Sequence, residues 1–204
     1  EATLGVTNPT MNDMLKLTYL NAKSKGITSL IGLETALNLT TLYLHQNTIS
    51  DISPLTGLTK LTVLNLYLNN ITDISPLSIL TKLYSLAISS NKITDISALA
   101  GLNNLIYLYI NNNQINDCSI LTGNTKFKEI YATRNAVLTK ETYLTYIPAI
   151  RANNPNLKVF QYDPGCKTVR STDVNQDCQV NLLDLAMIAS DWITCNHIYE
   201  EMCP

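Results

Sequence analysis

The sequence predicts an α/β repeat solenoid, in which short coils of chain stack and their strands form one continuous parallel sheet. Three observations support this prediction. Apolar residues recur with a fixed period of 22 residues, every period opens with an alternating apolar stretch typical of a strand, and the remainder is rich in turn-forming residues. One period cannot bury its apolar face alone, so neighbouring periods must stack against each other.

The period is defined by the residue that opens each unit. The opening residues are Leu17, Leu39, Leu61, Leu83, Leu105 and Phe127. Unit 61–82 reads LTVLNLYLNNITDISPLSILTK, and its LxxLxL stretch predicts a short strand with one buried face. We therefore expect six coils between residues 17 and 138.

One asparagine position repeats through the array. The ninth position of successive units holds Lys25, Asn47, Asn69, Asn91, Asn113 and Asn135. A side-chain amide can donate and accept hydrogen bonds, so it can satisfy backbone groups of neighbouring coils. We expect these asparagines to form a ladder along the flank of the solenoid.

The second half of each unit predicts a turn rather than a long helix. The motif IxDISPL contains Pro54 and Pro76, which restrict the residues that precede them. Its aspartate recurs as Asp51, Asp73, Asp95 and Asp117. We expect a tight turn or a 3₁₀ segment on the convex side of each coil.

An N-terminal cap is expected over residues 1–16. Thr10, followed three residues later by Asp13, is a helix-start pattern that predicts a short helix before the first coil. The sequence begins at Glu1 rather than Met, so any export signal is absent from this numbering. The opening EATLG resembles the tail of a helix that ends at Gly5, so we expect the native chain or an upstream domain to extend further.

A C-terminal cap is expected over residues 139–165, after repeats that span 17–138. A helix is predicted to open at Thr139, to kink at Pro148 and to stop before Pro155. The segment LKVFQY then supplies a last strand. Repeat arrays need such atypical ends to hide the core that a terminal coil would expose.

The units LTTLYLHQNTISDISPLTGLTK and LTVLNLYLNNITDISPLSILTK resemble the 22-residue bacterial leucine-rich repeats of internalin-like proteins. The resemblance covers about residues 9–162. It implies a right-handed leucine-rich-repeat arc with one parallel sheet on its concave face. It also implies that partners bind through that face and that the repeats are not catalytic.

The concave face is the predicted binding surface. Strand positions three, five and seven of each unit point away from the core, and six of the eleven tyrosines occupy them. They are Tyr19, Tyr43, Tyr67, Tyr107, Tyr109 and Tyr131. Tyrosine offers apolar area and a hydroxyl group at low entropic cost, which suits recognition, although it also favours strands in general. A protein or a glycan fits this surface, and His45 is interpreted as an ordinary surface residue.

Residues 173–184, DVNQDCQVNLLD, form a candidate calcium loop. Oxygen-bearing side chains stand at the positions at which an EF-hand loop supplies its ligands. They are Asp173, Asn175, Asp177, Gln179, Asn181 and Asp184. Leu185, Ile188 and Trp192 follow at helical spacing and predict a helix that buries this stripe. We predict bound Ca²⁺ here, with an ion-free, solvated acidic turn as the simpler interpretation.

The pattern DxNxDxxVNxxDL resembles one half of a type I dockerin over roughly residues 171–194. The resemblance implies a calcium loop followed by one helix, within a module over residues 166–204. Dockerins normally carry two such segments, whereas this chain has one. Leu182 and Leu183 stand where cohesin-contacting Ser and Thr are common, and Cys178 replaces the usual glycine. The resemblance therefore supports calcium binding more than cohesin binding.

Cysteine usage differs between the repeats and the tail. Cys118 replaces the Ile of equivalent positions 52, 74 and 96, so we expect a buried free thiol that packs as a small hydrophobe. The other four, Cys166, Cys178, Cys195 and Cys203, crowd into the tail module and favour disulfides in an oxidising compartment. Zinc is the rival interpretation, but no CxxC pair is present and His197 is the only imidazole nearby.

The disulfide connectivity is narrowed by one distance. Cys178 and Cys195 flank the predicted helix, which is about 15 Å long, whereas bridged Cα atoms lie within roughly 7 Å. Two pairings stay open: Cys166–Cys178 with Cys195–Cys203, or Cys166–Cys195 with Cys178–Cys203. Either would stabilise a module too small to rely on its own core.

Composition excludes several classes of function. The net charge is −2 and 15% of residues are charged, without a run of Lys and Arg, so no nucleic-acid partner is expected. The apolar runs are too short for direct membrane insertion. The two histidines lie in separate modules, and no nucleophile elbow or Gly-rich phosphate loop is present, so the chain is not expected to be an enzyme.

The sequence therefore predicts a non-catalytic, extracellular binding or adhesion protein, secreted or on a bacterial cell surface. Its calcium-stabilised tail would serve for anchoring or docking. The alternative is a structural subunit that self-associates head to tail into an extracellular filament or surface layer. Asn38 and Asn70 lie in N-glycosylation acceptor sequences.

Overall fold

The computed structural model describes residues 10–135 and 145–162. The calcium loop, its helix and the tail cysteines lie outside the described residues. The helices are α1 (Met11–Met14) and α2 (Ile147–Asn153). The strands are β1 (Tyr19–Asn21), β2 (Thr41–Tyr43), β3 (Val63–Asn65), β4 (Ser85–Ala87), β5 (Tyr107–Tyr109), β6 (Glu129–Ala132) and β7 (Val159–Tyr162). The 3₁₀ segments are η1 (Leu33–Thr35), η2 (Ser53–Leu55), η3 (Ser75–Leu77), η4 (Ser97–Leu99) and η5 (Ser119–Gly123).

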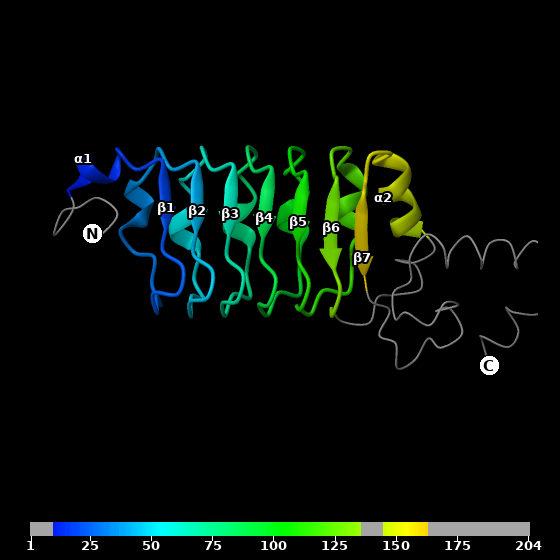
Figure 1. The fold of residues 1–204 in the computed structure, drawn as a ribbon, viewed down its shortest axis with the longest axis horizontal. Coiled ribbons are helices and arrows are strands. Elements are labelled where there is room, and N and C mark those ends of the chain that lie inside the picture. The colour runs from blue at the N-terminus through cyan, green and yellow to red at the C-terminus, as the bar shows by residue number, and fades with distance from the viewer. Residues whose placement is uncertain (1–9, 136–144, 163–204) are drawn as a thin grey trace, which may run out of the picture.

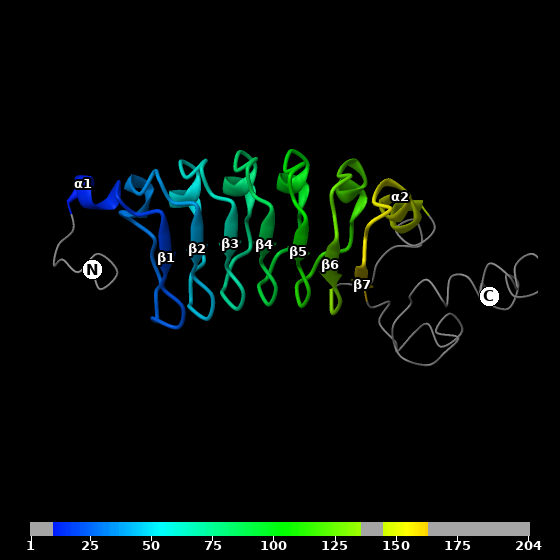
Figure 2. The same ribbon diagram turned by 45° about the horizontal axis from the view of Figure 1, so that its top comes forward.

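The strands form a single seven-stranded parallel sheet in sequence order. Each coil pairs with the next in the register that the sequence period predicts, for example Leu42 with Leu64. Figure 1 shows the strands side by side along the long axis, and Figure 2 shows the 3₁₀ segments on the opposite side of each coil. The predicted α/β solenoid with one continuous sheet is confirmed.

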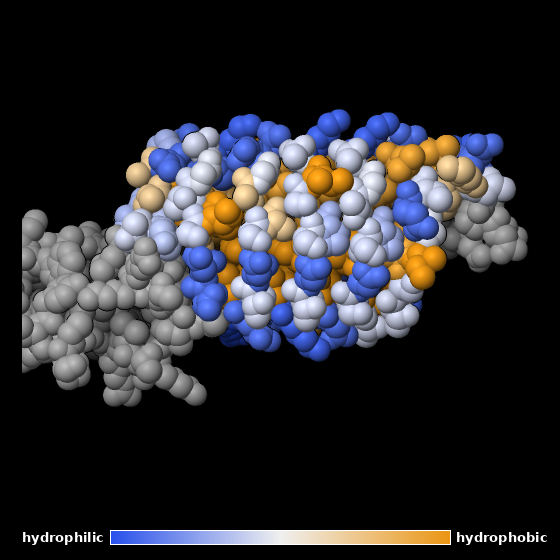
Figure 3. All heavy atoms as spheres, turned by 180° about the vertical axis from the view of Figure 1, so that it is seen from behind, coloured by the Kyte–Doolittle hydropathy of each residue, from blue (hydrophilic) through white to orange (hydrophobic). Residues whose placement is uncertain are grey.

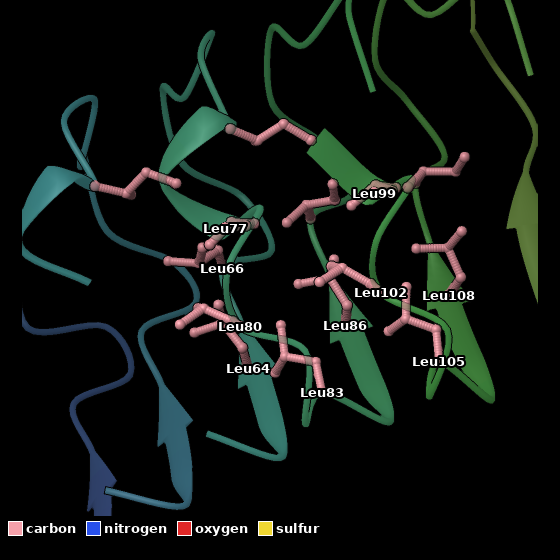
Figure 4. Packing of buried hydrophobic residues seen from close by; sticks show 14 of the residues in the cluster. Leu64, Leu66, Leu77, Leu80, Leu83, Leu86, Leu99, Leu102, Leu105 and Leu108 are labelled. Atoms are coloured by element: carbon pink, nitrogen blue, oxygen red, sulfur yellow. The ribbon is translucent and has the colours of Figure 1, made fainter. Parts of the chain in front are cut away.

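Leucine and isoleucine fill the space between the sheet and the 3₁₀ segments. Leu64 and Leu66 point inward from the strand side of one coil, and Leu77 meets them from its 3₁₀ segment (Figure 4). All three are at most 1% exposed. The same arrangement repeats in the next coils, so the buried residues make one continuous core along the solenoid.

The asparagine ladder is confirmed in atomic detail. Asn69 Oδ1 accepts the backbone N–H of Ile49 in the preceding coil at 3.0 Å. Its Nδ2 donates to the carbonyl of Leu44 in the preceding coil at 3.1 Å and to that of Leu66 in its own coil at 3.0 Å. Equivalent bonds are made by Asn47, Asn91, Asn113 and Asn135. Each asparagine therefore fastens its coil to the one before it.

A turn with positive φ precedes every asparagine of the ladder. The residue at position eight is left-handed in all six coils: Ser24, Gln46, Leu68, Ser90, Asn112 and Arg134, with φ between 53° and 60°. This conformation costs a non-glycine residue about 1 kcal/mol or more. Hydrogen bonds to the following coil offset the cost, as when Gln46 N–H donates to the Tyr67 carbonyl at 2.8 Å.

The aspartates of the IxDISPL motif hold the 3₁₀ turns. Asp73 accepts the backbone N–H of Ser75 at 2.7 Å and its hydroxyl at 2.9 Å. The same pair of bonds recurs at Asp51, Asp95 and Asp117. The predicted 3₁₀ segments are thus confirmed.

Both caps contain elements that the sequence predicts. In α1 the Thr10 hydroxyl accepts the N–H of Asp13, and the Asp13 carboxylate accepts the Thr10 N–H, which completes a capping box. At the other end β7 is the predicted last strand. Pro148 lies in the first turn of α2, directly after the π-helical residues 145–146, and the helix ends at Asn153, before Pro155 as predicted. The helix start predicted at Thr139 lies outside the described residues.

Candidate binding surface

The strand face consists of positions three, five and seven of the six coils, which point out of the sheet. From the second coil on, positions four and six, such as Leu86 and Ile88, are buried, while positions three and five are at least partly exposed in every coil. Ser89, at position seven, differs from the predicted pattern because it is only 4% exposed. Its hydroxyl donates to Asn111 Oδ1 at 2.6 Å, so a neighbouring side chain covers it.

The C-terminal tyrosine cluster contains Tyr107, Tyr109, Tyr131 and Glu129. The rings of Tyr109 and Tyr131 are stacked, with centroids 5.2 Å apart and planes 17° apart. The Tyr109 hydroxyl donates to Glu129 Oε2 at 3.2 Å, and Tyr107 pairs with Glu129 across the sheet. Burial raises the pKa of Tyr109, and the Glu129 charge adds to this rise. The cluster is a fixed aromatic surface beside one carboxylate.

The N-terminal tyrosine cluster contains Tyr19, Tyr43, His45 and Lys23. Tyr43 packs edge-on against Tyr19 at 5.9 Å and against His45 at 6.1 Å between ring centroids. Burial lowers the pKa of His45, and the nearby Lys23 ammonium lowers it further. His45 is therefore a neutral imidazole at pH 7, and its buried Nδ1 has no hydrogen-bond partner among the described residues.

The middle of the strand face carries smaller side chains. Ser85 and Ala87 occupy positions three and five of the fourth coil, and Tyr67 stands in the coil before, 37% exposed. All six tyrosines singled out from the sequence therefore lie on the strand face. The structure groups five of them into two clusters, with Tyr67 between.

Metal ligands are not gathered in the described part of the chain. No three His, Cys, Asp or Glu side chains there are placed to hold an ion. The predicted ligands Asp173, Asn175, Asp177, Gln179, Asn181 and Asp184 lie outside the described residues, so the calcium site stays a prediction. No helix in the described residues is long and apolar enough to cross a membrane.

Cys118 is the buried free thiol that the sequence predicts. Its side chain is 3% exposed and makes no disulfide. Burial raises its pKa to about 12, and the charge of Asp117 contributes. It is a core residue and takes no part in a reactive site.

A row of lysines along one edge was not found by reading the sequence linearly. Position 22 of one unit and position two of the next flank a buried residue, so their side chains emerge together at the edge where the strands begin. The lysines at these places, and their counterpart in the cap, are Lys60, Lys82, Lys126, Lys128 and Lys158, which are all exposed. Writing the units in register would have revealed the row, because Lys60, Lys82 and Lys126 share position 22 and Lys128 stands at position two of the next unit.

Known proteins share both the repeats and the fold. A family model described as leucine rich repeats (2 copies) matches residues 37–79, 59–101 and 81–124. No curated protein sequence matches the chain. Among solved structures, internalin C2 from Listeria monocytogenes is 30% identical with a TM-score of 0.61, and the alignment covers 80% of each chain.

Two further structures extend the comparison. An internalin (inlF) from Listeria monocytogenes is 25% identical with a TM-score of 0.63, and the match covers 80% of this chain but 54% of that one. The ectodomain of a plant receptor kinase from Arabidopsis thaliana, solved in complex with Casparian strip integrity factor 2, shares the fold alone. It is 21% identical with a TM-score of 0.56, and the match covers 61% of this chain and 16% of the ectodomain. Its repeats, its parallel sheet and its similarity to internalin C2 show that the chain belongs to the internalin-like leucine-rich-repeat proteins.

Proposed function

We propose that this chain is a non-catalytic, extracellular binding or adhesion protein that holds a protein partner on its strand face. The observation that carries the proposal is the placement of two tyrosine clusters on one rigid sheet. Both clusters expose ring surface, and strand pairing holds the backbone of each cluster. Rigid aromatic side chains bind with a small entropic cost, which is why they dominate protein interfaces.

The two clusters differ in charge, which supports a preferred orientation of the partner. The N-terminal tyrosine cluster contains Lys23, and Glu129 is hydrogen-bonded within the C-terminal one. They belong to β1 and β6 coils, which are roughly 24 Å apart at the usual spacing between strands. A partner with an acidic group near β1 and a basic group near β6 would bind in one direction only.

The tail belongs to the proposal through its sequence alone. Residues 166–204 would form a calcium- and disulfide-stabilised module that anchors or docks the solenoid. Its motif DVNQDCQVNLLD supplies oxygen atoms at the spacing that Ca²⁺ requires. An extracellular location fits the cysteine usage and the comparison with internalins.

The experiment compares the wild type with a Tyr43→Ala/Tyr109→Ala/Tyr131→Ala variant on arrays of proteins and glycans. We expect the variant to lose binding to the protein ligands that the wild type binds, because each substitution removes a ring from the strand face. Tyr84→Ala is the matched control, since Tyr84 is 41% exposed but lies at the strand-start edge. Equal binding by the triple variant and the wild type would remove the strand face from the proposal, and glycan ligands alone would change the class of partner.

A further inference from the structure

The strand-start edge of the solenoid concentrates positive charge. The lysine edge, defined as Lys60, Lys82, Lys126, Lys128 and Lys158, extends from the β3 coil to β7, which is roughly 20 Å at the usual strand spacing. Figure 3 shows hydrophilic groups following one another along the upper rim, where the strands begin in Figure 1. Positions 21 and 22 of the first five units and position two of all six contain no Asp or Glu.

Hydrogen bonds between coils place the C-terminal lysines on one edge. Lys158 N–H donates to the Lys128 carbonyl at 2.8 Å, and Lys128 N–H donates to the Ile106 carbonyl at 2.9 Å, so the two lysines are consecutive rungs. Lys126 Nζ donates to Asn104 Oδ1 of the preceding coil at 2.7 Å. The row therefore follows the stacking axis and is independent of the strand face.

Two adjoining hollows deepen the lysine edge at its C-terminal end. Their volumes are about 300 and 460 Å³, and both are lined by Lys128, Pro155 and Asn156. The first also has Lys126 in its wall and the second has Lys158, while neither is lined by an acidic residue. Three lysine side chains thus line this end of the edge, where a hollow can receive an anionic group.

None of the lysines of the edge forms a salt bridge among the described residues. The ion pair there is between Lys16 and Asp13, at the opposite end of the solenoid. Asp51, Asp73, Asp95 and Asp117 are engaged by the serines of the 3₁₀ turns. Glu129 is engaged by Tyr109 on the strand face. The lysine edge is therefore available to an external anion.

We propose that the lysine edge binds a linear sulfated polysaccharide. A linear polyanion matches a row of cations that follows one line, whereas an anionic bilayer presents its charges over a plane. The edge contains no arginine fork and one exposed aromatic residue, Tyr84, whereas surfaces for single-stranded nucleic acid interleave cations with several stacking rings. Sulfate esters stay ionised at every physiological pH and accept hydrogen bonds from lysine ammonium groups.

The test is fluorescence anisotropy of the full chain titrated into fluorescent heparin, a sulfated polysaccharide, at 0.15 M NaCl. Lys126→Gln/Lys128→Gln/Lys158→Gln should weaken binding by about tenfold or more, since it removes three of the five ammonium groups of the lysine edge. Lys25→Gln/Lys92→Gln/Arg134→Gln is the matched control, because it removes three exposed cations that lie off the edge. Circular dichroism checks that both variants fold.

Four outcomes decide the proposal. Selective loss by the edge variant, with affinity falling as salt rises, supports it. Equal losses by both variants would show that net charge alone drives binding and would overturn it, as would absence of wild-type binding. Tighter edge-dependent binding of oligo-dT or of phosphatidylserine vesicles than of heparin would overturn the assigned ligand. Desulfated heparin serves as the ligand control, and its binding as tightly as heparin would exclude sulfate recognition.

Discussion

Asn91 shows how much one side chain can stabilise a solenoid. Its amide accepts from the N–H of Ile71 and donates to the carbonyls of Leu66 and Ile88, and all of these groups are buried. Asn91→Ala leaves them unpaired, so we expect the free energy of unfolding to fall by about 2–4 kcal/mol. Urea unfolding followed by circular dichroism measures the change. Asn103→Ala, on an exposed site, should change it by less than about 0.5 kcal/mol, and equal effects would contradict the role of the ladder.

Cys118 gives a second test at the residue scale. A thiol whose pKa is about 12 is protonated at pH 8, and the thiolate is the form that reacts. Iodoacetamide should therefore leave the Cys118 peptide unmodified in the native protein and modify it in urea, as followed by mass spectrometry. Thr94→Cys, which places a thiol on the exposed surface nearby, should react in the native state. Rapid native labelling of Cys118 would show that the site opens to solvent.

At the scale of elements, the stability of the α1 cap and of the 3₁₀ turns depends on pH. Hydrogen bonds from Thr10 and Lys16 lower the pKa of Asp13 from 3.8 to about 2, and those from Ser53 lower that of Asp51. A folded-state pKa below the unfolded value stabilises the fold above about pH 4, and this contribution is lost as the pH falls through the folded-state value.

Thermal unfolding between pH 6 and pH 2 tests this assignment. Asp13→Asn and Asp51→Asn should each lower the unfolding midpoint relative to the wild type at pH 6. Their difference from the wild type should shrink as the pH falls below about 4, because the wild-type carboxyl groups then take up protons. A difference that stays constant down to pH 2 would mean that the carboxylate charge is irrelevant to the turns.

The elements that repeat from coil to coil could be predicted from the sequence. The strand at 63–65, the turn at 75–77 and the ladder all follow from local periodicity, because each coil places the same residue types in the same environment. One feature of the C-terminal cap could not be predicted in this way. Asn154 donates to the Asn124 carbonyl and accepts the Phe127 N–H, at 2.7 Å each. This long-range arrangement depends on how α2 packs, which no period records.

In the candidate sites too, the sequence predicted the position of residues but not the contacts between their side chains. Alternation predicted that Tyr109 and Tyr131 lie on the strand face, but their stacking and the bond to Glu129 depend on side-chain conformations in adjacent coils. Ser89 was expected to be exposed and is covered by Asn111 for the same reason. The lysine edge required comparison between coils rather than along the chain.

For the whole molecule, the calcium prediction separates the tail from the repeats. Adding Ca²⁺ should protect residues 166–204 from limited proteolysis, because the ion would fix the loop that contains Asp173 and Asp184. EDTA should restore cleavage there and leave the repeats intact. Asp184→Ala should abolish the protection, and mass spectrometry of the fragments locates the cuts. Protection that persists in EDTA would leave the loop without a metal role.

The direction of the asparagine ladder has a consequence for synthesis of the chain. Every asparagine of the ladder bonds to the coil before its own. Asn113, for example, accepts the N–H of Ile93 and donates to the carbonyl of Ile88. A coil that has just left the ribosome therefore still lacks the amide that will satisfy its interior, and it waits for the next 22 residues before it can close. Growth of the native structure must trail translation by one turn of the solenoid, and the final rung can be set only after the residues beyond the fifth coil have emerged.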